Sequence, residues 1–67
     1  MSNNKEKNRP QHVLYESKFV GIKGLPFAIK DAQHLKVPLA IHKYDEKMVL
    51  EYIKNHELSF VIDVKII

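Results

Sequence analysis

The sequence alternates between two kinds of hydrophobic spacing, and this alternation is what most constrains its fold. Residues 12–22, 37–43 and 59–67 carry apolar side chains at the two-residue spacing of a strand, whereas 27–35 and 45–55 carry them at helical spacing. This order predicts a small α+β domain of β-α-β-α-β order, with about three strands and two helices packed on one face of the sheet. It leaves open whether the sheet is parallel, mixed or antiparallel.

The pattern predicts a helix most strongly over residues 45–55. Asp45 is a typical N-cap residue, and we expect it to accept a hydrogen bond from the amide of Lys47 or Met48. Asn55 can adopt the left-handed conformation that closes a helix. One apolar stripe follows Asp45 and consists of Met48, Val49, Tyr52 and Ile53. We expect this stripe to be buried against the sheet.

The other segments carry weaker signals. Pro26 is well placed as the first residue of a helix over 27–35, although that helix lacks a capping side chain, and a strand over 27–30 is the alternative. The alternation in 12–22 is imperfect, which predicts a strand with a bulge. Residues 59–67 form the clearest strand pattern, with Phe60, Ile62, Val64 and Ile66 on one face.

A chain of 67 residues without cysteine has room for one domain and no disulfide to stabilise it. Residues 1–11 have the polar composition of a flexible tail, so the domain is expected over 12–67. Lys5, Lys7 and Arg9 against Glu6 place a charge of +2 on this tail, and eight lysines against seven acidic residues leave +1 on residues 12–67. The domain is therefore nearly neutral, unlike the concentrated basic face of most nucleic-acid-binding proteins.

The sequence contains no catalytic or metal-binding motif, so we expect no catalytic residues, no metal, no cofactor and no enzymatic activity. The four histidines lack the spacing of a metal site. Nucleophilic catalysis requires an activated hydroxyl or thiol, and the chain offers only Ser2, Ser17 and Ser59. His42 and Asp45 are close enough in sequence to form a pair, but a structural role for Asp45 is the simpler interpretation.

Neither a membrane span nor a signal peptide is expected, because no apolar run is long enough and residues 1–11 are polar. Together with the lack of cysteine, this favours a cytoplasmic location.

The remaining features predict a small non-enzymatic module that binds another protein, as a regulator, inhibitor or adaptor. The apolar strand over 59–67 has an edge that could pair with a second chain, so we expect a homodimer. Four side chains lie on strand faces that the pattern does not assign to the core. These candidate interface residues are Tyr15, Phe19, Val61 and Ile67.

The alternative is a small nucleic-acid-binding protein that uses the basic tail and scattered lysines. Its phosphate-contacting residues would be Lys5, Lys7, Arg9, Lys18, Lys23 and Lys36. A helix-turn-helix over residues 32–45 is not favoured, because Pro38 and strand-like alternation fall where the recognition helix should be.

Overall fold

The computed structural model describes residues 10–67. In chain order its elements are β1 (Val13–Tyr15), α2 (Ser17–Val20), the 3₁₀ turn η1 (Ile22–Gly24), α3 (Leu25–Leu35), β2 (Leu39–Ile41), the 3₁₀ turn η2 (Lys43–Asp45), α4 (Glu46–Asn55) and β3 (Val64–Ile66). The predicted β-α-β-α-β order is confirmed, with the short α2 added after β1. Residues 1–9 of the predicted tail lie outside the described part of the chain.

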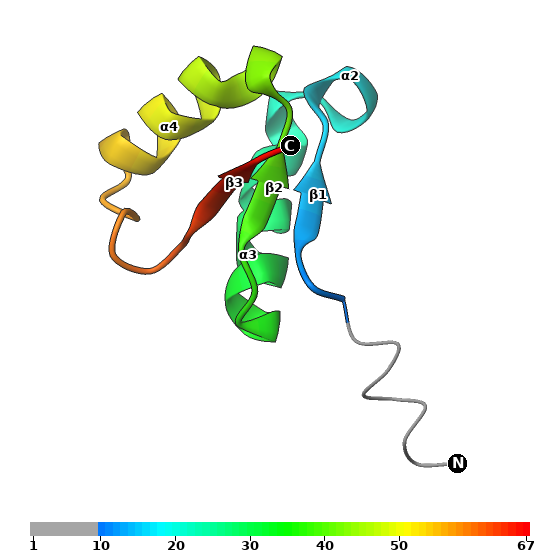
Figure 1. Ribbon diagram of the computed structural model, residues 1–67. Coiled ribbons are helices and arrows are strands. Elements are labelled where there is room, and N and C mark those ends of the chain that lie inside the picture. Colours follow the sequence, from blue (N-terminus) through cyan, green and yellow to red (C-terminus); the bar gives the residue numbers. More distant parts are fainter. Residues whose placement is uncertain (1–9) are drawn as a thin grey trace.

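The three strands form one parallel sheet in the order β1-β2-β3 (Figure 1). Parallel neighbours need a crossover connection, and α3 and α4 supply the two crossovers. When the strand order is not reversed, two crossovers of the same hand place both helices on one face. The sequence left the strand directions open, and the structure shows that all three strands are parallel.

The core lies between that face of the sheet and the two long helices. β2 is the central strand, and its three residues are all buried. The core cluster consists of Tyr15, Leu25, Ile29, Ala32, Leu39, Ile41, Val49, Ile53 and Ile62. The opposite face carries Leu14, Ala40 and Lys65, which are neighbours in the strand register. Leu14 and Lys65 are exposed there, whereas Ala40 between them is fully buried.

Two strands are much shorter than predicted. The segment 12–22 is extended only over Val13–Tyr15 and then enters α2, and the segment 59–67 forms a strand only over Val64–Ile66. Residues 59–61 form a turn, closed by a hydrogen bond from the Val61 N–H to the Leu58 carbonyl. Both outer strands pair with the three-residue β2, which limits how far each ladder can extend.

The two long helices match their predicted ranges more closely than the outer strands do. α3 contains Pro26 in its first turn and has no side-chain cap, as predicted, although it begins at Leu25. On α4, Val49 and Ile53 are buried, while Met48 and Tyr52 pack partly buried against the core. The predicted left-handed closure at Asn55 is wrong. The left-handed torsion after α4 belongs to Glu57, with φ of 55°.

Candidate functional site

The carboxyl ends of β1 and β2 meet at one end of the sheet, where a buried carboxylate joins two helix starts. α2 follows β1 and η2 follows β2 at this end (Figure 1). Asp45, the last residue of η2, is 4% exposed. Its Oδ2 accepts a hydrogen bond from the Ser17 backbone N–H at 3.1 Å, and its Oδ1 accepts one from the Ser17 hydroxyl at 2.5 Å. This carboxylate therefore holds the start of α2 beside the start of α4.

The predicted N-cap hydrogen bond of Asp45 is not formed. Asp45 occupies the N-cap position of α4, but its side chain bonds no amide of that helix. Its backbone has φ of −99° and ψ of −2°, because η2 runs directly into α4. N-cap residues that bond their own helix usually have extended torsions. The carboxylate is therefore directed to α2 instead.

A second polar group lies at the same end of the sheet, closer to solvent. The Nε2 of His42 lies 2.8 Å from the Oε2 of Glu16, and the His42 ring stacks on Tyr44 with 5.1 Å between ring centroids. The Nζ of Lys18 lies over the Tyr44 ring, 4.7 Å from its centroid. Partial desolvation, and then the charges of Glu16 and Asp45, raise the pKa of Tyr44. These contacts connect the segments that follow β1 and β2.

Ser17 and His42, which lie at the same end of the sheet, do not form a catalytic pair. The Ser17 hydroxyl bonds Asp45 and the His42 ring bonds Glu16, so neither is in place to activate the other. The His42–Asp45 pair considered from the sequence is replaced by these two separate contacts. Across residues 10–67, histidine and acidic side chains also form no group of three or more that could hold a metal ion.

An apolar depression runs beside β1, where the sheet edge meets α2 and α3. It encloses about 390 Å³. Its lining consists of Val13, Leu14, Tyr15, Glu16, Phe19, Val20, Gly24, Phe27, Ala28 and Asp31. We call it the β1 groove. Phe19 and Phe27, which are 79% and 69% exposed, contribute the largest apolar side chains. The charged residues of the lining, Glu16 and Asp31, are both acidic.

The backbone along this groove is an open strand edge. β1 pairs with β2, and within residues 10–67 no strand pairs with its other side. The Val13 N–H donates to the Pro38 carbonyl at 3.0 Å, so the polar groups of Val13 face β2. Successive residues of a strand direct their N–H and C=O groups to opposite sides. Those of Leu14 therefore face outward, where another strand could bind them.

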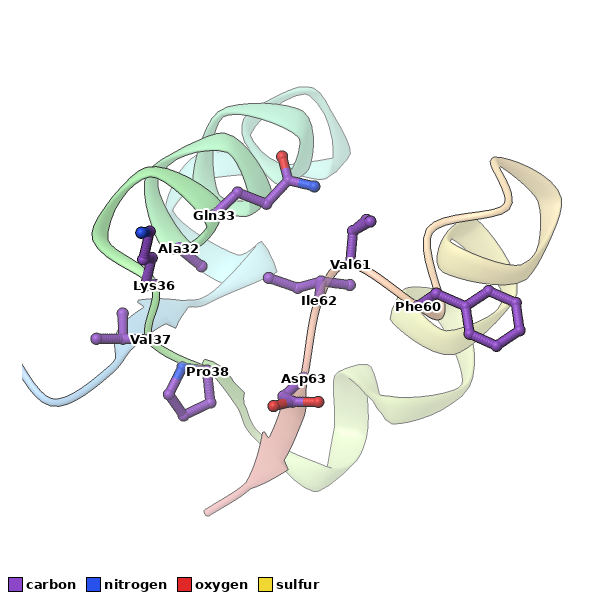
Figure 2. Close-up of a pocket in the computed structure, with 9 residues that line it drawn as sticks. All are labelled: Ala32, Gln33, Lys36, Val37, Pro38, Phe60, Val61, Ile62 and Asp63. Atoms are coloured by element: carbon purple, nitrogen blue, oxygen red, sulfur yellow. The ribbon is translucent and has the colours of Figure 1, made fainter.

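A second depression lies at the amino ends of the strands, between the end of α3 and the turn before β3. Figure 2 shows its nine lining residues, and its volume is about 310 Å³. Val61 and Ile62 face α3 in this view, whereas the Phe60 ring is turned away. Phe60 is 99% exposed. No residue of β3 itself lines this depression, so it offers no strand edge comparable with that of β1.

The structure separates the four interface residues predicted from the sequence. Tyr15 is 1% exposed and forms the floor of the β1 groove, where its hydroxyl donates to the Gly21 carbonyl at 2.8 Å. Phe19 forms a wall of the same groove. Val61 lines the second depression, and Ile67 follows β3 at the other edge of the sheet, with its N–H bonded to the Ile41 carbonyl. Only Tyr15 and Phe19 are brought together.

The lysines of the nucleic-acid interpretation are also dispersed. Lys18 and Lys23 precede α3, whereas Lys36 follows its last residue, eleven helical residues away. An α-helix of that length spans about 16 Å. Lys5, Lys7 and Arg9 lie outside the described residues. Lys36 therefore lies at the opposite end of α3 from Lys18 and Lys23.

Sequence reasoning missed Leu14, Phe27 and the acidic residues Glu16 and Asp31 as parts of one site. A signal was present for Phe27, because it falls outside the apolar stripe of Ala28, Ile29, Ala32 and Leu35 on the helix. A large apolar residue on the outer side of a helix indicates a binding surface when others lie near it. That nearness depends on the fold and is not visible in the sequence.

Comparisons with protein-family models, curated proteins and solved structures found no match. None of the helices in residues 10–67 has the length and apolar character that a membrane crossing requires. The function is therefore argued from the geometry of this chain.

Proposed function

We propose that this protein is a non-enzymatic protein-binding module that regulates, inhibits or adapts a larger partner. It works by pairing the open edge of β1 with an extended polypeptide. The observation that carries this proposal is the position of Phe19 and Phe27 in a groove directly beside an unpaired strand edge. As part of the same proposal we assign the protein to the cytoplasm, since a cysteine-free sequence suits a reducing compartment.

Strand addition uses two kinds of contact, and the β1 groove supplies both. The outward N–H and C=O groups of Leu14 provide main-chain hydrogen bonds, while the apolar lining receives alternate side chains of the added strand. Fully burying an aromatic side chain such as Phe19 or Phe27 contributes about 1.5–3 kcal/mol. Glu16 and Asp31 favour a strand that carries positive charge near the ends of its apolar segment.

A capped peptide of alternating Val and Thr, with Lys at each end, is a direct probe of this surface. We expect it to shift the backbone amide resonances of Leu14, Glu16 and Phe27 in an NMR titration. The variant Phe19→Ser/Phe27→Ser should lose most of the affinity, because both groove walls are truncated.

Phe60→Ser is the matched control for that variant. It removes an even more exposed ring that does not line the β1 groove, so peptide binding should be unchanged. Shifts that gather around Phe60, or no shifts at any accessible peptide concentration, would contradict the proposal.

A further inference from the structure

We infer that the polypeptide that pairs with β1 is a second copy of this chain. The two β1 strands join antiparallel about a two-fold axis at Leu14, so that two sheets become one continuous sheet. This inference rests on the proposed function, because it takes the β1 edge as the binding surface and names its occupant.

The backbone of β1 has the alternation that such a two-fold axis needs. Leu14 directs both its N–H and its C=O outward, so two Leu14 residues can exchange a pair of hydrogen bonds. His12 and Glu16 have the same parity. Glu16 has extended torsions, φ of −133° and ψ of 109°, so the strand conformation continues past Tyr15. Its N–H is thus directed to the same open edge.

The side chains in this register are complementary as hydrogen-bond donor and acceptor. Antiparallel pairing about Leu14 places His12 of each copy opposite Glu16 of the other, on the sheet face away from the helices. Glu16 uses its Oε2 to hold His42, which leaves its Oε1 to accept from His12 of the second copy. Cross-strand pairs that share a hydrogen bond stabilise neighbouring antiparallel strands. Residues 12–16 thus contain both members of each His12–Glu16 pair between the two copies.

The apolar side chains on the helix face are covered by the same arrangement. A two-fold axis beside β1 brings the two grooves together, so Phe19, Val20 and Phe27 of each copy face those of the other. All three side chains are more than half exposed in the single chain. A chain of 67 residues without disulfides is of the size that gains stability from association. Asp31 lies exposed in the lining and can remain hydrated.

Charge exchange in the register tests the inference most sharply. In the His12→Glu variant, the introduced carboxylate meets Glu16 in both pairs, so we expect the dimer dissociation constant to rise on the order of tenfold. In Glu16→Lys, the carboxylate that accepts from His12 of the second copy is lost. An equimolar mixture of the two variants restores one Glu–Lys pair and one His–Glu pair. Light scattering over a dilution series should therefore show a heterodimer tighter than either variant alone.

Leu14→Lys and Phe60→Ser complete the set. The lysine introduced by Leu14→Lys adds a charge at the centre of the pairing edge, so this variant should be a folded monomer by light scattering and circular dichroism. Phe60→Ser should remain a dimer. A dimer that persists in Leu14→Lys, or a mixture of the charge variants that is no tighter than its parts, would overturn the inference.

The peptide titration separates this inference from the proposed function. A wild-type chain that stays monomeric but binds the Val-Thr peptide at the β1 groove contradicts the second-copy inference alone. A chain that stays monomeric and leaves the peptide unbound contradicts both.

Discussion

Asp45 and Ser17 join two parts of the chain that are 28 residues apart. Asp45 is the buried charged side chain of the described residues, and its two oxygens both accept hydrogen bonds from Ser17. Hydrogen bonds to a charged group are stronger than neutral ones, and an unpaired buried amide is costly. This contact fixes where β1 ends and α2 begins, which in turn places Phe19 in the β1 groove.

Truncating this contact should destabilise the fold. We expect Asp45→Ala to lower the free energy of unfolding by about 1.5–3 kcal/mol and Ser17→Ala by about 1 kcal/mol. Urea unfolding measures both. The double variant should lose less than the sum, because the two residues share one interaction. Asp63→Ala, which removes an exposed carboxylate, is the control and should change little. Fully additive losses would mean that Asp45 and Ser17 act independently.

Tyr15, on the floor of the β1 groove, makes the stability of the fold depend on pH in the alkaline range. Burial, and then the charge of Asp45, raise its pKa above the ordinary value of 10.0. The unfolded chain therefore releases the phenolic proton at a lower pH than the folded chain does, and stability falls as the pH rises above about 10.

Tyr15→Phe isolates this effect. It removes the hydrogen bond to the Gly21 carbonyl, so it should cost about 0.5–1.5 kcal/mol near neutral pH. The advantage of the native chain over the variant should shrink above about pH 10, because only the native chain has this phenol to keep protonated. Urea unfolding from about pH 7 to about pH 11 measures the difference. An advantage that is constant or grows with pH would contradict the assignment.

At the level of elements, Gly21 separates α2 from η1. It has φ of 67° and ψ of −178°, a region that is open almost only to glycine. Gly21→Ala should therefore cost roughly 1–3 kcal/mol in urea unfolding, although a Cβ there would meet no atom within 4 Å. Lys23→Ala, on the same exposed segment, should be nearly neutral. A neutral Gly21→Ala would show that the connection adopts another conformation.

The strand lengths mark the limit of what sequence periodicity could predict. The spacing of residues 59–67 correctly placed Ile62 and Val64 toward the helices, but it could not reveal that β2 offers only three residues for pairing. Residues 12–22 likewise looked like one strand. The start of α2 depends on a hydrogen bond from Ser17 to the Asp45 carboxylate, and its end depends on the positive φ of Gly21. The local hydrophobic pattern indicates neither feature. The range and the apolar stripe of α4 were predicted correctly, because the stripe needs no partner to be recognised.

The candidate site was likewise predicted only in part from the sequence. Phe19 was predicted as an interface residue and lines the β1 groove. Tyr15 was placed on the surface because the imperfect alternation of 12–22 left its face undecided, and the structure buries it. Val61 and Ile67 have exposed apolar side chains but lie away from this groove. The sequence could identify apolar residues without a core role, but only the topology shows which of them are neighbours.

For the whole molecule, the parallel sheet leaves β1 and β3 as its two edges. The helices cover one face, and the β1 edge adjoins the groove with Phe19 and Phe27. An open strand edge beside exposed aromatic rings is a surface that proteins usually cover. In the proposed dimer, the second copy covers both the edge and the rings.

Amide hydrogen exchange at Leu14 tests this account most directly. In a single chain the Leu14 N–H faces solvent, whereas the Val13 N–H is bonded to Pro38. We predict that exchange at Leu14 slows as protein concentration rises, while exchange at Val13 is slow throughout. In the His12→Glu variant, the same slowing at Leu14 should require a protein concentration higher by on the order of tenfold. Fast exchange at Leu14 in the native chain at every concentration, with Val13 protected, would contradict the claim that a second copy of the chain covers the β1 edge.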